Sequence, residues 1–331
     1  MYPAAPPSSH VFLGASRRWQ AAACHNRPEH GRADVADGDW DEATRRAIAW
    51  LLESEEPAIR SLTRRDLLGG RADPDDGILA GPKVTALLGG QRPDGAFGVH
   101  PYSKWRGAHW RLVSLVELGV PAHEPRSTRA ADTVLAWLTS EGHRSRITTV
   151  DGLVRRCASQ EGNVLAVCSR LGLAEDDRVG LLADSLIDWQ WPDGGWNCDI
   201  AASGRRSSFH ESLPAMWGLF EYWLATGDER AKAAAMRTAE LLLKHRVYHS
   251  LHAGAVINRA WLALHYPPYW HYDVLQALLV LSRVGVAGDP RCRGAASPTA
   301  GGARAPIGGS RPARMLARSR WSTGAARPRT R

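Results

Sequence analysis

The stretch Gln190-Trp191-Pro192-Asp193-Gly194-Gly195-Trp196 follows an amphipathic segment, and Gln91-Arg92-Pro93-Asp94-Gly95-Ala96-Phe97 has nearly the same form. In both, a glutamine precedes a Pro-Asp-Gly turn, and a large aromatic residue follows at a fixed offset. The two glutamines stand 99 residues apart. Repetition of this kind indicates a chain built from similar units, so it determines the predicted architecture.

Glycines mark the ends of the predicted helices. They fall 50, 53, 55 and 58 residues apart, and glycine readily takes the left-handed conformation that ends a helix. Acidic helix starts follow three of them, where carboxylates suit the positive end of the helix dipole. Apolar residues between these points follow helical spacing, and no alternation demands a strand. We therefore predict five helical hairpins of about 50 residues, stacked in an open solenoid or closed into a ring. The segments that contain the glycines are Leu67-Leu68-Gly69, Leu118-Gly119-Val120, Leu171-Gly172-Leu173, Leu224-Ala225-Thr226-Gly227 and Val284-Gly285-Val286.

These features resemble the α/α-toroid superfamily, which contains squalene–hopene cyclases and protein prenyltransferase β-subunits. The resemblance rests on the QW motif: a glutamine, three residues, a glycine, one residue and a tryptophan. The second copy is complete, and the first has Phe97 in place of tryptophan. The resemblance implies an all-α, α/α-toroid domain at residues 39–292, with inner helices that line a cavity and outer helices that surround it. It also implies that Gln91, Phe97, Gln190 and Trp196 tie outer helices together.

Charge and composition separate this body from the two ends. Residues 293–331 hold nine arginines and no Lys, Asp or Glu, so removing them from the formal net charge of +8 leaves the rest at −1. A nearly neutral body argues against a nucleic-acid partner. We predict a disordered leader at 1–38 and a disordered arginine-rich tail at 293–331. The tail also suits a shifted reading frame that replaced a last hairpin.

Location follows from the cysteines and the hydropathy. Five scattered cysteines (24, 157, 168, 198 and 292) lack a disulfide framework and favour reduced thiols in the cytoplasm. No apolar run approaches 18 residues, and the N-terminus lacks the apolar stretch of a signal peptide. Peripheral membrane contact, which occurs in squalene cyclases, stays open, and the sequence predicts no oligomeric state.

Polar and aromatic residues gather at equivalent points of three repeats, where the resemblance places the mouth of the cavity. We predict one pocket there for an apolar small molecule such as an isoprenoid. The expected substrate-binding residues are Trp105, His109, Trp110, Trp270 and Tyr272, and the expected catalytic residues are Asp199, Asp273, His271 and His210.

Three classes of function remain open at this point. A terpenoid cyclase needs a strong acid and aromatic faces that stabilise carbocations; Asp73-Pro74-Asp75-Asp76 matches the cyclase acid motif literally but follows the end of a predicted helix. A zinc prenyltransferase would need Asp, Cys and His ligands, for which Cys198, Asp199 and His210 are the nearest set, although adjacent side chains usually diverge. The third class is a non-catalytic toroid that binds a ligand or a protein. We predict neither a cofactor nor a resident metal.

Overall fold

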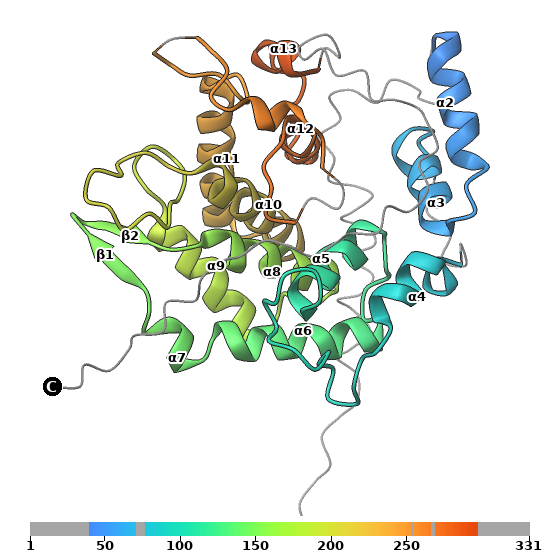
Figure 1. Ribbon diagram of the computed structural model, residues 1–331, viewed down its shortest axis with the longest axis horizontal. Helices are drawn as coiled ribbons and strands as arrows, with labels where there is room; N and C mark the ends of the chain where they lie inside the picture. Colours follow the sequence, from blue (N-terminus) through green and yellow to red (C-terminus); the bar gives the residue numbers. More distant parts are fainter. Residues whose placement is uncertain (1–39, 71–76, 253, 266–268, 297–331) are drawn as a thin grey trace, which may run out of the picture. The chain divides into compact units, whose positions relative to one another are not determined.

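The computed structural model describes residues 40–70, 77–252, 254–265 and 269–296, and the described part is mostly helical (Figure 1). The chain divides into residues 1–300 and 301–331, and everything described belongs to the first unit. The α-helices are α2 (Glu42–Leu52), α3 (Pro57–Asp66), α4 (Pro82–Leu88), α5 (Ala108–Glu117), α6 (Pro125–Leu138), α7 (Glu141–Arg144), α8 (Ala158–Arg170), α9 (Asp177–Trp189), α10 (Phe209–Thr226), α11 (Glu229–Lys244), α12 (Val274–Arg283) and α13 (Arg293–Ala296). Short 3-10 helices are η2 (Ile78–Ala80), η3 (Arg259–Leu262) and η4 (Pro290–Cys292).

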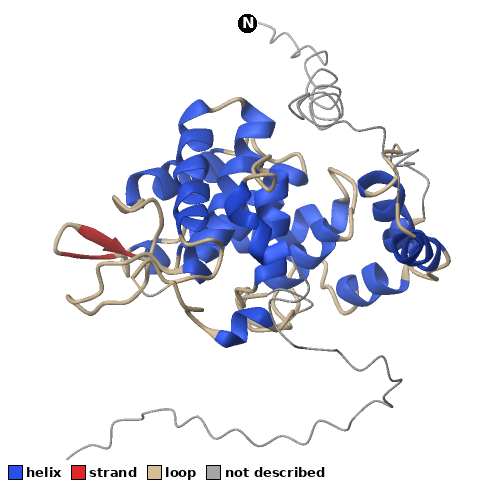
Figure 2. Ribbon diagram, turned by 90° about the horizontal axis from the view of Figure 1, so that it is seen from above, coloured by secondary structure: helices blue, strands red, loops and turns tan. Residues whose placement is uncertain are grey.

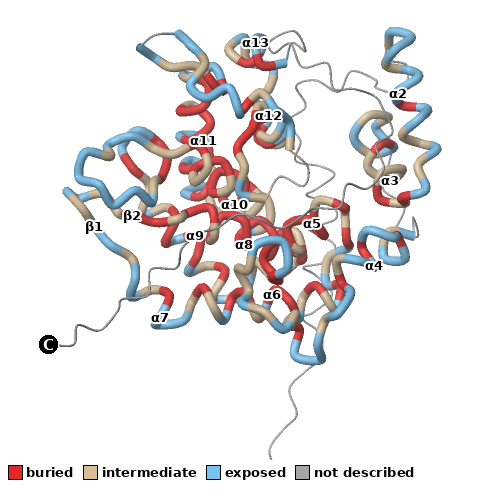
Figure 3. Tube along the Cα trace, viewed as in Figure 1, coloured by how far each residue is buried: buried red, intermediate tan, exposed pale blue. Residues whose placement is uncertain are grey.

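The core follows α5, α8 and α10, which are buried along most of their length (Figure 3). In α8 every residue from Ala158 to Ser169 except Gln160 is buried, as expected for a helix covered on all sides. This helix contacts both α5 and α10, and α10 also contacts α12. The intervening helices α6, α9 and α11 are amphipathic and bury one face each. The described elements therefore alternate between deeply buried helices and helices that cover them.

Two glycines allow α8 and α10 to approach closely. A Cβ atom added at Gly218 would lie 2.2 Å from the carbonyl oxygen of Gly162. A Cβ added at Gly162 would lie 2.5 Å from the backbone of Ala215. No side chain fits at either crossing point, so the backbones themselves are in contact there.

The repeated glutamine segments make the same contacts in both copies. Gln190 Nε2 donates to the carbonyl oxygens of Gly194 and Ala234, at 2.9 Å each, and thereby joins the end of α9 to α11. Gln91 Nε2 donates to the carbonyl of Gly95 at 3.2 Å and to that of Arg126, in α6, at 2.8 Å. Each glutamine thus closes its own turn and holds the next covering helix.

The glycine of each turn lies against that same covering helix. Gly95 and Gly194 have φ values of +88° and +100°. A Cβ would meet the carbonyl oxygen of Arg129 at 2.3 Å in the first copy and that of Arg237 at 2.6 Å in the second. Both the positive φ and the lack of space require glycine.

Helix ends agree with the sequence signals. All five terminal glycines, at 69, 119, 172, 227 and 285, have positive φ values. The predicted acidic starts are N-caps: the carboxylates of Asp176, Asp228 and Asp289 each accept a bond from the backbone N–H two residues later. In each case that later residue is an arginine whose side chain also binds the cap.

One short β-hairpin was not expected from the sequence. Strands β1 (Thr148–Val150) and β2 (Leu153–Arg155) pair antiparallel, with Thr148 opposite Arg155, and the hairpin extends away from the helices (Figure 2). Asp151 and Gly152 form its turn with φ values of +50° and +75°. A two-residue Asp-Gly loop with positive φ at both positions is the strongest local signal for a hairpin. The expectation of no strand was therefore wrong at this point.

At their C-terminal ends, the buried helices are joined by ion pairs. Arg170 of α8 lies 3.0 Å from Glu117 of α5 and 3.6 Å from Glu221 of α10. Glu117 also pairs with Arg283, the last residue of α12. Four helices that are far apart in the sequence therefore share one network of charges.

Three predicted features fall wholly or mostly outside the described residues. This applies to the leader at 1–38, the segment Asp73-Pro74-Asp75-Asp76 and the tail beyond Ala296. Within the described part, α13 continues four residues past the predicted domain end at 292. Among the same residues, no helix combines the length and apolar character needed to cross a bilayer.

Candidate functional site

The segment before α5 meets the segment before α12. The ring of Tyr269 lies edge-on to Trp105, with centroids 4.0 Å apart, and to Trp110 at 5.7 Å. Next along the chain, Trp270 lies under the ammonium of Lys104 at 4.5 Å. The structure thus brings together three of the predicted substrate-binding residues, Trp105, Trp110 and Trp270, through contacts between segments that lie about half the chain apart in sequence.

His109 and Trp110 occupy the first turn of α5 and are almost completely buried. His109 Nε2 faces the Asn163 amide nitrogen at 3.4 Å, and the Tyr102 ring lies edge-on at 5.0 Å. Burial lowers the pKa of His109 to about 3, so the imidazole is neutral at physiological pH. Trp110 Nε1 and His109 Nδ1 have no hydrogen-bond partner among the described residues.

Tyr272 packs in the core and hydrogen-bonds to the backbone. It is 1% exposed, and its hydroxyl donates to the carbonyl of Val247 at 2.6 Å. Its ring contacts Phe209 and Trp261, with centroids 5.2 and 4.7 Å away. His210 borders this cluster at 6.1 Å from the Tyr272 ring, and burial lowers the pKa of His210. His210 and Tyr272 are therefore close, but Tyr272 is enclosed by other side chains.

His271 lies in a stack of three rings. Its ring is nearly parallel to that of His265 at 4.2 Å and also stacks on Trp270 at 4.0 Å. Partial burial and the neighbouring His265 lower the pKa of His271. A neutral imidazole at this position could accept a proton, but donating one would require a lower pH.

The carboxylate of Asp273 is fully buried and fully engaged. It caps α12 by accepting from the backbone N–H of Gln276 at 2.9 Å. Its other oxygen accepts from the backbone N–H of His265 at 2.8 Å and lies 3.3 Å from His265 Nδ1. These contacts place Asp273 as the residue that fixes the start of α12 beside the aromatic rings.

Asp199 lies apart from these rings on an exposed loop. Its carboxylate accepts from the backbone N–H of Ala201 at 3.0 Å, as in an ordinary Asx turn. The preceding Cys198 turns instead toward Glu211, and the two adjacent side chains diverge. The set Cys198, Asp199 and His210, considered above as the nearest zinc ligands, is therefore not assembled.

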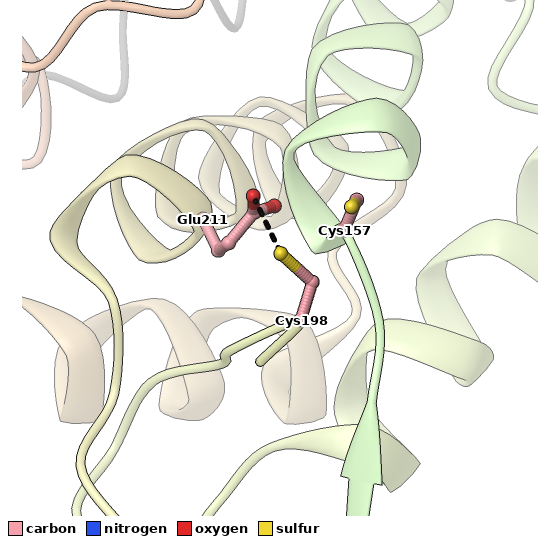
Figure 4. A group of neighbouring side chains, drawn as sticks. All are labelled: Cys157, Cys198 and Glu211. Carbon is pink, nitrogen blue, oxygen red and sulfur yellow. Dashed lines mark hydrogen bonds between the residues drawn. The ribbon is translucent and has the colours of Figure 1, made fainter. Parts of the chain in front are cut away.

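A different group of metal-ligating atoms converges nearby. The sulfurs of Cys157 and Cys198 and a carboxylate oxygen of Glu211 lie within 4.8 Å of one another (Figure 4). Cys157 comes directly before α8, Cys198 lies in the loop after the second glutamine segment, and Glu211 is in the first turn of α10. Within the described part of the chain, these are the three His, Cys, Asp or Glu residues whose ligating atoms lie close enough together to hold a metal ion.

Backbone pairing explains why the two cysteines meet. Arg155 and Asn197 form a parallel β-bridge, and the N–H of Arg156 donates to the carbonyl of Asn197 at 3.1 Å. The residues that follow on the two segments, Cys157 and Cys198, are consequently neighbours. The proximity of the two sulfurs raises the pKa of Cys157 and lowers the pKa of Cys198.

Glu211 is held in place from the start of α8. Its Oε2 accepts from the backbone N–H of Ser159 at 2.9 Å, while Oε1 lies 3.6 Å from Cys198 Sγ. Burial raises the pKa of Glu211. Next to it, Arg156 is buried and donates to Glu161 and contacts His143. A compact set of thiol, carboxyl and guanidinium groups thus lies at the junction of α8 and α10.

Neither Cys157 nor Glu211 was among the residues predicted for the site, and no local pattern pairs them with Cys198. The signal was their shared position, since all three precede or begin predicted helices of adjacent repeats. A separate cavity, lined by Arg246, His249, Pro290, Arg291 and Gly294, contains none of the predicted residues.

Comparisons of the chain with protein-family models, with curated proteins and with solved structures gave no match.

Proposed function

We propose that this protein is a terpenoid-cyclase-like or prenyltransferase-like α/α toroid that binds an isoprenoid over the aromatic residues before α5 and α12. The observation that carries the proposal is the contact of Tyr269 with the exposed Trp105, beside the exposed Trp270, while the buried Trp110 packs against Tyr269. Aromatic faces attract cations through their quadrupoles, and they also provide apolar area for a hydrocarbon chain. Both properties suit an isoprenoid and the carbocations formed from it.

The helix contacts support a toroid arrangement. The helices α5, α8, α10 and α12 contact one another in succession, and α12 returns to α5 through the Arg283–Glu117 ion pair. At the opposite ends of these helices, Tyr269 returns to Trp110. The glutamine segments join successive covering helices, from α9 to α11 in one copy. The resemblance implies both features: inner helices that contact one another in chain order, and outer helices joined by glutamines.

One positive charge beside the aromatic rings, that of Lys104, suits an anionic head group. Lys104 is exposed and lies over the Trp270 ring, so its ammonium can meet a diphosphate next to the aromatic rings. Arg156, in contrast, is already paired with Glu161. We therefore assign head-group contact to Lys104.

Binding without conversion is the second candidate, and the state of the two predicted acids favours it. Asp273 is engaged as the cap of α12, and Asp199 is exposed in a turn. Both oxygens of Asp273 already accept backbone hydrogen bonds, and Asp199 is exposed, so neither presents a free carboxyl to an alkene in a dry pocket. In this alternative the same aromatic surface holds an isoprenoid, and no carbocation forms.

Product analysis separates these candidates. The full chain is incubated with squalene, farnesyl diphosphate and geranylgeranyl diphosphate, and the extracts are examined by mass spectrometry. A cyclase or transferase gives new products, which decrease in Trp105→Ala and Tyr269→Ala but not in Trp50→Ala, a control at an exposed tryptophan of α2. Conversion that persists in Asp199→Asn and Asp273→Asn would remove both aspartates from the chemistry. Unchanged substrates that nevertheless bind would establish the second candidate.

A further inference from the structure

Three groups able to bind a metal come together from separate parts of the chain. Cys157, Cys198 and Glu211 belong to the start of α8, a loop and the start of α10, and their ligating atoms lie within 4.8 Å. The backbone bridge between Arg155 and Asn197 fixes the two cysteines, and the bond from Ser159 fixes the carboxylate. The arrangement thus depends on the fold and is not a local accident of sequence.

Distances within the group suit a tetrahedral ion. With Zn–S of about 2.3 Å and Zn–O of about 2.0 Å, the sulfur and oxygen ligands of one Zn²⁺ lie about 3.5 Å apart. Cys198 Sγ and Glu211 Oε1 are 3.6 Å apart. Small rotations of the side chains would bring the third donor, Cys157 Sγ, to the same centre.

The ligand types select the metal. Thiolates favour soft or borderline ions and make Mg²⁺ and Ca²⁺ poor candidates, while a tetrahedral set that mixes sulfur with oxygen suits Zn²⁺. The Ser159 N–H bound to the other oxygen of Glu211 is the kind of outer partner that orients a carboxylate ligand. Cys168 and Cys292, the other free cysteines among the described residues, are both buried and outside this group.

Exposure at the group leaves room for a further ligand. Cys198 is exposed and Cys157 is partly exposed, so the ion would face solvent on this side. Three protein ligands with one open position are typical of catalytic zinc sites, and four are typical of structural ones.

We propose that Cys157, Cys198 and Glu211 bind a single Zn²⁺ whose fourth position is open to water. This replaces the sequence-based expectation of no resident metal. The site is independent of isoprenoid binding, because none of its ligands belongs to the rings around Tyr269.

The test measures metal in the full chain purified under reducing conditions, without any isoprenoid. We expect about one equivalent of zinc by elemental analysis. After exchange with Co²⁺, the visible and near-ultraviolet spectra should show tetrahedral coordination and sulfur-to-cobalt charge transfer. Zinc binding should weaken in Cys157→Ser, Cys198→Ser and Glu211→Gln. For each cysteine variant we expect a loss of affinity of more than about 100-fold, because even residues that only hydrogen-bond to a ligand contribute about 10–100-fold.

The matched control is Cys168→Ala, which removes a thiol from α8, the helix that follows Cys157, and should keep the metal. The cobalt spectrum of the wild-type protein tests thiolate ligation even if a variant fails to fold. Absence of stoichiometric zinc would overturn the proposal. So would a cobalt spectrum without sulfur ligation, unchanged binding in folded Cys157→Ser and Cys198→Ser, or a Cys157–Cys198 disulfide under these conditions.

Discussion

Arg283 at the end of α12 forms a two-bonded ion pair with Glu117 at the end of α5, 166 residues earlier, with N–O distances of 2.9 and 2.7 Å. Both side chains are largely buried. Burial alone would raise the pKa of Glu117, but the guanidinium groups of Arg283 and Arg170 outweigh it and leave that pKa below its ordinary value. This pair links α5 with α12, the first and last in sequence of the four helices that share the charge network.

Removing the carboxylate should destabilise the protein strongly. Glu117→Gln removes the carboxylate that Arg283 and Arg170 share and leaves Arg170 only its longer ion pair with Glu221, and we expect the free energy of unfolding to fall by about 3 kcal/mol. Chemical denaturation of the variant, of Arg283→Met and of the double variant measures the coupling. The double variant should lose less than the sum of the single losses. Additive losses would contradict a direct link between α5 and α12.

The crossing of α8 and α10 should tolerate no side chain at Gly218. Gly218→Ala places a methyl group 2.2 Å from the Gly162 carbonyl oxygen, and we expect a loss of about 1–3 kcal/mol. Gly180→Ala in α9 is the matched control, because its Cβ meets nothing closer than the Tyr222 hydroxyl at 3.7 Å. That control should gain about 0.5–1 kcal/mol from higher helix propensity. Similar effects of the two changes on thermal denaturation would disprove the close crossing.

The donor group of Gln190 should account for the link between α9 and α11. Gln190→Glu keeps an acceptor for Arg237, whose Nε lies 2.6 Å from Gln190 Oε1, but loses the bonds to the Gly194 and Ala234 carbonyls. We expect a loss of about 1–3 kcal/mol from the two lost hydrogen bonds. Gln91→Glu should act in the same direction, since Gln91 makes equivalent bonds. Denaturation curves that match the wild type would argue against this role.

Stability should decrease in mild acid because of His109. The pKa of this imidazole is about 3 in the folded protein and about 6.5 in the unfolded chain. Between these values the unfolded state binds more protons, so the free energy of unfolding falls as pH falls. The slope from this one group is at most about 1.4 kcal/mol per pH unit. His109→Gln should reduce the slope between pH 6 and pH 4 by about this amount, as measured by denaturation at several pH values. An unchanged slope would show that His109 is not buried neutral.

The helices and their ends could be predicted because their signals are local. Gly227 ends α10 with a positive φ value, and Asp228 caps α11, both as the sequence indicated. The contacts of Gln91 and Gln190 followed from a repeated phrase. In each case the chemistry lies within a few residues of the signal, or recurs in two copies that can be compared.

The site was harder to predict because its contacts cross the chain. No local pattern shows that Cys157 meets Cys198, since a backbone bridge between Arg155 and Asn197 brings them together. Asp273 illustrates the converse problem. A carboxylate beside histidines reads as an acid in the sequence, whereas the structure uses it as an N-cap. The Asp151-Gly152 dipeptide is a local signal for a hairpin, but the prediction of helical repeats left no place for a strand there.

The central claim is that the segments before α5 and α12 form one binding surface for an isoprenoid. Calorimetric titration of the full chain with geranylgeranyl diphosphate tests it most directly. We predict saturable binding that Tyr269→Ala weakens by about tenfold or more, equivalent to about 1.4 kcal/mol, while Trp50→Ala leaves it unchanged. Absence of binding, or equal affinities for the two variants, would contradict the claim.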